Sequence, residues 1–249
     1  MQDFSAPLSD RDLLRLLEAL DVGPELTWEP AAGAEGARWT GHLPVLAWLV
    51  RTQRPAVLVD ASGDAPGFAA ACQVIAEHAL PVRAFAAGTT ATPAAYAHFA
   101  TRLDASAGDA PGRFTAGSVD LLRLAAPLSA AAARATFAAW HAVLSDRAVV
   151  LWHGTGGRDD ADGLWRVWQD LAGTYPAFEF ANHGGLGVLG VGRQVPATLQ
   201  ALFELNEQAE DAARLRHLFA TRGEALCWPA ERAALATELD RARQALAEA

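Results

Sequence analysis

The sequence contains no lysine, so all 20 of its basic residues are arginine. Together with the many alanines, this indicates a GC-rich coding bias, and the arginine count by itself carries little functional information. The missing lysine also excludes one class of phosphate-binding loop. Gly154, Gly156 and Gly157 are not followed by Lys-Ser or Lys-Thr, and the sequence therefore does not predict nucleoside triphosphate binding.

Cysteine is scarce as well. Cys72 and Cys227 lie far apart and lack the spacing of metal ligands, which favours two buried thiols in a reducing compartment. The N-terminus has no basic segment followed by an apolar core, so we expect no signal peptide. No apolar run reaches the roughly 20 residues of a membrane span. We expect a soluble, cytoplasmic protein.

Charge and length limit the function further. The net charge of −9 and the pI near 5.2 argue against nucleic acid or an anionic membrane surface as the main partner. With 249 residues, of which 51% are hydrophobic, the chain is long enough for one large domain with appendages. We divide it into an N-terminal helix and linker (1–38), an α/β domain (39–194) and a C-terminal helical extension (195–249).

Short apolar runs alternate with amphipathic segments through the middle of the chain. The expected strands are Val57–Asp60, Val82–Ala86, Val119–Leu124 and Ala148–Trp152. The expected helices between and after them are Gly67–His78, Pro93–Leu103, Ser129–Leu144 and Gly163–Ala172. This alternation is typical of a parallel sheet with helices on both faces.

The pattern changes after the last of these helices. Phe178–Asn182 and Leu186–Val191 are strands joined by a connection too short for a crossover helix, so they must pair antiparallel. We therefore predict an α/β fold with a doubly wound, mostly parallel seven-stranded sheet, a terminal antiparallel hairpin and flanking helices. After Pro196 we expect helix to about Leu226, a break at Trp228–Pro229, and a further helix to the end.

The last expected helix carries a narrow apolar stripe. Leu235, Leu239, Ala242 and Leu246 follow one another at alternating four- and three-residue steps, as in a short coiled-coil seam. Three interpretations stay open: a helix packed on the domain, a homodimer seam, and the start of a connection to a partner domain.

The first expected strand ends in an acid, Asp60, and is followed by a loop of small residues. Cofactor-binding α/β domains hold an adenosine at such a place, because the tight turn brings the ligand to the backbone and the helix N-terminus. The candidate cofactor-binding residues are therefore Asp60, Ser62, Gly63 and Gly67. A helix-capping role is the alternative for Asp60.

Several segments, taken in order, resemble a family of class I S-adenosylmethionine-dependent methyltransferases found next to glycosyltransferase domains in bacterial polysaccharide loci. The matching segments are Trp39–Pro44, Trp48–Val50, Arg54–Pro55 leading into Val59–Asp60, Gly117–Leu122, Val149–His153, Leu164–Trp168, Phe178–Phe180 and His183–Leu189. The resemblance implies the class I methyltransferase fold and S-adenosyl-L-methionine as cofactor. It also implies a small-molecule or glycan acceptor and a glycosyltransferase partner.

The sequence departs from this family where the chemistry would be. Ser62 replaces a glycine, and Ala86–Ala87 stands where the family has an acid for the ribose hydroxyls. In the stretch Arg123–Ala130 the three positions that are functional in the family are apolar. We therefore predict weak or absent cofactor affinity. We expect no metal site, since Ala125, Leu128 and Gly154 stand where ligands would be.

Histidines are the remaining candidates for chemistry. His153 would deprotonate an acceptor hydroxyl during direct displacement at the sulfonium, or it would be a structural histidine bonded to a loop carbonyl. His42 would line the cofactor pocket or cap the following helix. His183 is expected to be solvated in its turn, and the loop acids Asp159, Asp160 and Asp162 to cap a helix rather than bind metal. The alternative function is a non-catalytic module for oligomerisation or for holding a glycan-modifying enzyme.

Overall fold

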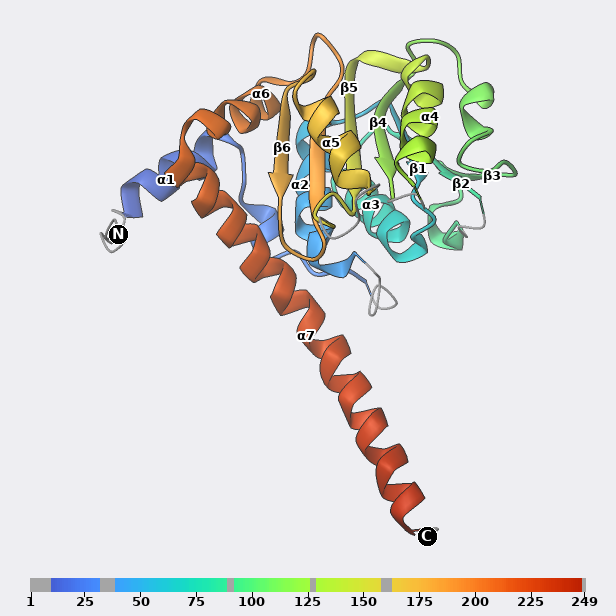
Figure 1. Cartoon of the computed structure of the whole chain (residues 1–249), viewed down its shortest axis with the longest axis vertical. Coiled ribbons are helices and arrows are strands. Elements are labelled where there is room, and N and C mark those ends of the chain that lie inside the picture. The colour runs from blue at the N-terminus through green and yellow to red at the C-terminus, as the bar shows by residue number, and fades with distance from the viewer. Residues whose placement is uncertain (1–9, 32–38, 89–91, 126–128, 158–162, 248–249) are drawn as a thin grey trace.

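The computed structural model describes residues 10–31, 39–88, 92–125, 129–157 and 163–247. Its centre is a seven-stranded sheet in the order β3-β2-β1-β4-β5-β7-β6. The strands are β1 (Val57–Ala61), β2 (Arg83–Ala87), β3 (Ala100–Leu103), β4 (Val119–Leu124), β5 (Leu144–His153), β6 (Ala177–Phe180) and β7 (Leu186–Gly190). Strands β1 to β5 pair in parallel, and β7 is antiparallel to both of its neighbours. The predicted doubly wound sheet with a terminal antiparallel hairpin is confirmed (Figure 1).

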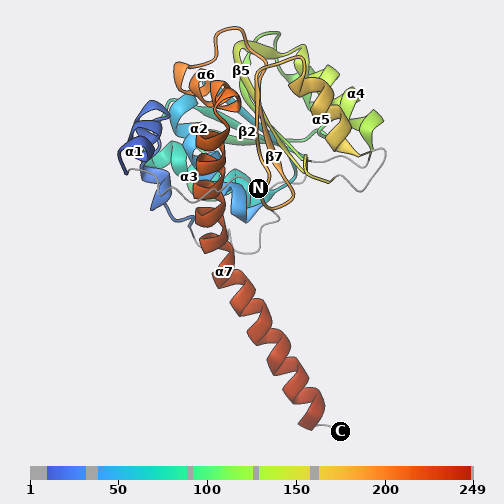
Figure 2. The same cartoon turned by 60° about the vertical axis from the view of Figure 1, so that its left-hand side comes forward.

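Helices cover both faces of the sheet (Figures 1 and 2). The α-helices are α1 (Asp10–Ala19), α2 (Leu43–Gln53), α3 (Ala65–Glu77), α4 (Ala130–His141), α5 (Leu164–Ala172), α6 (Ala197–Glu204) and α7 (Ala209–Ala247). Side chains from α1, α2, α3, α6 and α7 form one buried cluster with one face of the sheet. Helices α4 and α5 form a second cluster with the other face. Alternate residues along each strand therefore enter different cores.

The segment predicted as the helix Pro93–Leu103 is different in the structure. Only a short 3-10 turn forms, Ala94–Tyr96, and β3 follows it. Strand β3 pairs in parallel with β2, with Ala84 opposite Ala100. The alanines of this segment favour helix locally, but the hydrogen bonds offered by the open edge of β2 outweigh that preference. This is the strand that the sequence pattern did not locate.

The break expected at Trp228–Pro229 is wrong, because α7 is one helix of 39 residues that continues through Pro229. A proline removes one main-chain donor, and the other hydrogen bonds of so long a helix outweigh that loss. Ala212, Leu215 and Phe219 are buried against the body, whereas Trp228 is 64% exposed. Beyond this point α7 extends away from the domain (Figures 1 and 2).

Two side chains close the outer edge of β6. Asn206 Nδ2 donates a hydrogen bond to the Ala177 carbonyl at 2.6 Å, and Arg216 Nε donates one to the Glu179 carbonyl at 2.7 Å. The α6–α7 segment thereby satisfies acceptors that an edge strand would otherwise offer to another chain. Among the described helices, α7 included, none combines the length and the apolar character needed to cross a membrane.

Candidate functional site

The candidate site lies where the strand order reverses. From β1 the sheet runs through β2 to β3 on one side and through β4 to β5 on the other, and open α/β sheets bind ligands at the carboxyl ends of the strands beside such a point. Asp60 near the end of β1 is paired in register with Arg123 of β4. Leu58 and Leu121, two residues earlier, both belong to the core under α2 and α3. The side chains of Asp60 and Arg123 therefore point to the same face.

Arg123 forms two buried ion pairs at this point. Its Nη1 lies 2.6 Å from Asp60 Oδ2, and its Nη2 lies 2.5 Å from Asp64 Oδ2. The Arg123 side chain is only 2% exposed. Burial opposes its charge, but attraction to the two carboxylates outweighs this and raises the pKa of Arg123 above its usual value. One guanidinium thus pairs with both acids of the crevice.

Gly67, in the first turn of α3, makes room for this guanidinium. A Cβ at Gly67 would lie 2.3 Å from Arg123 Nη1 and Nη2 and 2.4 Å from Asp64 Oδ2. The guanidinium therefore rests directly against the helix backbone, at the place where the sequence predicts cofactor. Gly63 has a different role in the preceding turn. Its φ of +75° is a conformation that residues other than glycine rarely adopt.

Ser62 completes the polar contacts of Asp60. Its backbone N–H and its hydroxyl donate to Asp60 Oδ1 at 2.9 and 2.6 Å, and its Oγ accepts from the Asp64 N–H at 3.2 Å. Both carboxylate oxygens of Asp60 are therefore engaged, Oδ1 by Ser62 and Oδ2 by Arg123. The alternative that Asp60 caps the helix is wrong, because Asp64 is the N-cap residue of α3, and its carboxylate also binds Arg123.

His153 and His42 continue the network away from Arg123. Arg123 Nε donates to His153 Nε2 at 3.1 Å, and since a guanidinium can only donate, the proton of His153 must reside on Nδ1. That nitrogen faces His42 Nδ1 at 3.3 Å, and His42 Nε2 faces the Asn182 carbonyl at 2.8 Å. The only consistent assignment has two neutral imidazoles, each donating one hydrogen bond and accepting one.

Burial explains why both histidines stay neutral. Removal from water lowers the pKa of His153 well below 6.5, and the nearby positive charge of Arg123 adds to this shift. Burial likewise lowers the pKa of His42 to about 4. His42 occupies the N-cap position of α2, as the capping alternative predicts, but its side chain forms no capping hydrogen bond and faces the Asn182 carbonyl instead.

Trp39 and His183 enclose the histidine pair. The Trp39 ring lies 4.6 Å from the His153 ring, and the His183 ring meets His42 edge-on at 5.8 Å, measured between centroids. The expectation that His183 is solvated is wrong for its ring: a Cβ on Gly41 would lie 2.1 Å from its Cδ2, and its Nε2 is buried. The hairpin turn therefore folds onto the segment before α2.

The other sequence candidates contribute less to this site. Ala86 and Ala87, at the end of β2, are buried and supply no carboxylate. Asp159, Asp160, Asp162 and Leu128 lie outside the described residues. Within the described part of the chain, no group of three or more histidine, cysteine or acidic residues is placed to hold a metal ion.

Sequence reasoning missed Arg123 and Asp64. The signal for Arg123 was present: it is a single charged residue in an otherwise apolar strand end, Leu121–Leu124, just as Asp60 is in its own strand. Asp64 gave a weaker signal, because an acid in a loop before a helix is ordinarily a cap.

The chain is similar to known proteins both in sequence and in fold. No family model matches it. It is 30% identical over 220 residues to the uncharacterized protein y4gI of Sinorhizobium fredii, a match that covers 80% of this chain and 23% of that protein. The chain thus spans about a quarter of the length of this curated relative.

Solved structures with similar folds include methyltransferases. One, from Geobacter sulfurreducens, is 13% identical with a TM-score of 0.45, covering 75% of this chain and 90% of that one. Another is the 1,6-didemethyltoxoflavin-N1-methyltransferase of Burkholderia thailandensis with bound S-adenosylhomocysteine, which is 13% identical with a TM-score of 0.43. That match covers 74% of this chain and 91% of the other.

Proposed function

We propose that the chain is a non-catalytic module with a methyltransferase-like fold, whose cofactor crevice is filled by the protein's own side chains. The observation that carries this proposal is the Arg123 guanidinium, buried against Gly67 and paired with Asp60 and Asp64. In the methyltransferase family that the sequence resembles, the acid at the end of the first strand organises the methionine end of S-adenosyl-L-methionine. Here that acid is Asp60, and it is already paired with Arg123.

The residues of the crevice do not fit this cofactor. Even a methyl group on Gly67 would overlap the guanidinium, so a ligand has no close approach to the α3 backbone there. The cofactor carries a positive sulfonium, and the Asp60 carboxylate that would face it is already paired with another cation, Arg123. Ala86 and Ala87 offer the ribose no carboxylate, a loss of about 1.5–3 kcal/mol for hydrogen bonds to a charged group.

The environment of His153 supports a structural role over the predicted catalytic one. A general base needs a free lone pair directed at its substrate. In this network Nε2 of His153 accepts from Arg123, and Nδ1 is directed at His42. The side chain is 1% exposed. Methyl transfer with His153 as base would require the network to open, and it stays the competing hypothesis.

The proposed module acts through a partner, and α7 is the element that would hold it. This helix continues beyond the last side chains buried against the body, and Trp228 lies exposed where it leaves. The resemblance to glycosyltransferase-associated proteins favours a partner from glycan biosynthesis in the cytoplasm. A second copy of the chain is the alternative partner for α7.

The test is calorimetric titration of the full-length protein with S-adenosylmethionine and S-adenosylhomocysteine. We expect no binding, or dissociation constants above about 1 μM, which corresponds to about −8 kcal/mol. A sub-micromolar constant for either ligand would overturn the proposal and support an active methyltransferase. The Arg123→Ala variant, titrated in parallel, shows whether the guanidinium is the block, because binding recovered in that variant alone supports the proposal.

A further inference from the structure

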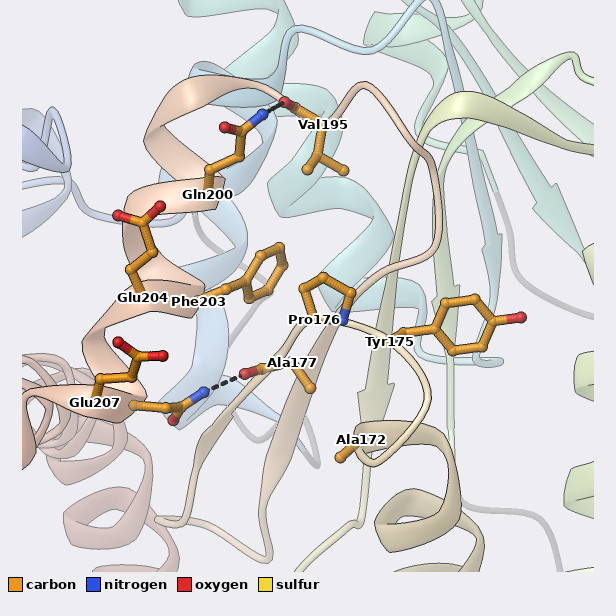
Figure 3. Close-up of a pocket in the computed structure, with 10 residues that line it drawn as sticks. Ala172, Tyr175, Pro176, Ala177, Val195, Gln200, Phe203, Glu204 and Glu207 are labelled. Atoms are coloured by element: carbon orange, nitrogen blue, oxygen red, sulfur yellow. Dashed lines mark hydrogen bonds between the residues drawn. The ribbon is translucent and has the colours of Figure 1, made fainter.

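The first half of α7 is held firmly to the body, so the direction of each of its faces is fixed. Just before α7 begins, Asn206 Nδ2 donates to the Ala177 carbonyl at 2.6 Å (Figure 3). Further along, Gly223 lies directly against the segment before α2, where a Cβ would overlap the Gly41 carbonyl. The helix therefore cannot turn about its axis without losing these contacts.

This part of α7 has two opposite faces. The face toward the body carries the buried residues Ala212, Leu215, Phe219 and Leu226. The outer face is polar over the same length, with the exposed residues His217, Thr221 and Glu224. At about 3.6 residues per turn, Trp228 lies about 160° around the helix from Leu226, so it belongs to the outer face. Trp228 is the first large apolar residue of that face, and it is 64% exposed.

The apolar stripe of the sequence continues the outer face from Trp228. Leu235 follows Trp228 by seven residues, about two helical turns, and the same line continues through Leu239, Ala242 and Leu246. The helix is continuous over all of these positions. The body lies against the opposite face, and α7 has left it here (Figures 1 and 2). The chain's own domain is therefore not the partner of this stripe.

The charges beside the stripe match those of a second copy of the chain. With the stripe at heptad positions a and d, Glu238 takes position g and Arg243 takes position e. In a parallel pair of helices, g of one faces the following e of the other, so Glu238 of each copy meets Arg243 of the other. An antiparallel pair would instead place Glu238 opposite Glu238 of the second copy. Charge therefore favours a parallel pair.

Arg232 restricts the pairing further. It falls at an a position, and it is the one charged residue in the seam between Trp228 and Leu246. A single polar residue at such a position favours one register and one number of strands, at a cost in stability. The seam is also shorter than three heptads. Both features indicate a specific association that is weak and reversible.

We propose that α7 from Trp228 onward pairs with the same segment of a second copy as a parallel, two-stranded coiled coil. The seam holds Trp228 and the leucines, and Glu238 and Arg243 form an ion pair on each side of it. This rests on the proposed role of α7 in binding a partner, and it identifies that partner. It does not rest on the filled crevice at Arg123.

The experiment is sedimentation of the full-length protein over a series of concentrations. We expect a reversible dimer with a dissociation constant below about 1 mM. Glu238→Arg and Arg243→Glu should each weaken it about tenfold, because each replaces two attractive pairs by two repulsive ones. The variant with both substitutions should regain the native affinity. Asp240→Arg is the matched control, since it changes the net charge as Glu238→Arg does but lies outside the e and g positions.

Cysteine cross-linking tests the parallel orientation. In a Cys227→Ser background the remaining cysteine, Cys72, is buried. Ala242→Cys, in the seam, should give an intermolecular disulfide with oxidised glutathione, because equivalent d positions are adjacent in a parallel pair. Thr237→Cys, on the opposite face of the helix, should not.

A protein that stays monomeric up to about 1 mM would overturn the proposal. A double variant that fails to regain affinity, or an Asp240→Arg variant as weak as Glu238→Arg, would overturn it by showing that the charges act only through the net charge. A dimer that cross-links through Thr237→Cys and not through Ala242→Cys would overturn the parallel seam. Tight binding of S-adenosylhomocysteine would overturn the non-catalytic function and leave the dimer standing, so the two failures are distinguishable.

Discussion

Asp60 and Arg123 occupy paired positions on two neighbouring parallel strands, and their side chains form an ion pair of 2.6 Å in the interior of the protein. Burying a charge without a partner costs free energy of folding, and each of these two residues offsets that cost for the other. Asp64 adds a second carboxylate to the same guanidinium. The residues from which the sequence predicts a cofactor site are here part of the hydrogen-bonded core.

The first prediction is that Arg123→Ala destabilises the fold strongly. The substitution leaves two buried carboxylates without a cation, which costs about 3–5 kcal/mol of unfolding free energy. Arg134→Ala is the matched control, because Arg134 also pairs with an acid, Asp170, but both side chains are more than half exposed. We expect less than about 1 kcal/mol there. Urea unfolding of both variants measures the difference, and similar losses would contradict the role of Arg123.

The second prediction concerns the space at Gly67. Gly67→Ala places a methyl group 2.3 Å from the Arg123 guanidinium, which must shift away from one of its carboxylates, and we expect a loss of about 1–3 kcal/mol. Gly112→Ala is the control, since a Cβ at Gly112 would meet nothing within 4 Å. Thermal unfolding of the two variants compares them directly. A Gly67→Ala protein as stable as the native one would show that the Arg123 guanidinium can shift without losing an ion pair.

The fold could be predicted from the sequence because most strands are continuous apolar runs and the last two are joined by a very short turn. Strand β3 could not, since its composition resembles a helix and only the open edge of β2 makes it a strand. The break placed at Pro229 failed for a related reason: a local rule about proline was outweighed by the length of α7.

The site was predictable only in part. Asp60 and His153 stand out as polar residues at strand ends, and both lie in the observed network. Their partners could not be found by spacing, because His42 and His153 are 111 residues apart in sequence and meet only through the topology of the sheet. Arg123 was visible as a charge in an apolar strand, but its meaning depends on its register with Asp60.

The third prediction is a loss of stability in mild acid. In the unfolded chain a histidine has a pKa near 6.5, whereas in the folded protein burial lowers the pKa of His42 to about 4 and that of His153 well below 6.5. Between these values the unfolded state binds more protons, so the stabilisation present above pH 6.5 is lost as the pH falls toward 4. The slope reaches about 1.4 kcal/mol per pH unit for each histidine.

Urea unfolding at several pH values across this window measures that slope. The His42→Asn variant should show a smaller pH dependence, because one of the two groups that resist protonation has been removed. The His98→Asn variant is the control: His98 lies outside the network, with its ring against Phe99, and the pH dependence should stay as in the native protein. A stability that is constant between pH 6.5 and 4 would contradict the neutral assignment of the histidine pair.

The last prediction concerns the two parts of α7. The last side chain of α7 that is buried against the body is Leu226 among the residues whose burial is described, so deleting the chain from Pro229 onward should leave the melting temperature of the body nearly unchanged. Phe219→Ala, by contrast, removes a fully buried ring that contacts Trp48 and Phe180, and it should cost about 3–5 kcal/mol. Thermal unfolding distinguishes the two effects, and failure of the truncated chain to fold would mean that the distal helix belongs to the core. The stripe of Leu235, Leu239, Ala242 and Leu246 leaves two proposed partners for this distal part, a different protein and a second copy of the chain. Sedimentation distinguishes them: a dimer of the full chain that becomes a monomer on truncation would assign the helix to self-association, and a monomeric full chain would leave a different partner protein for it.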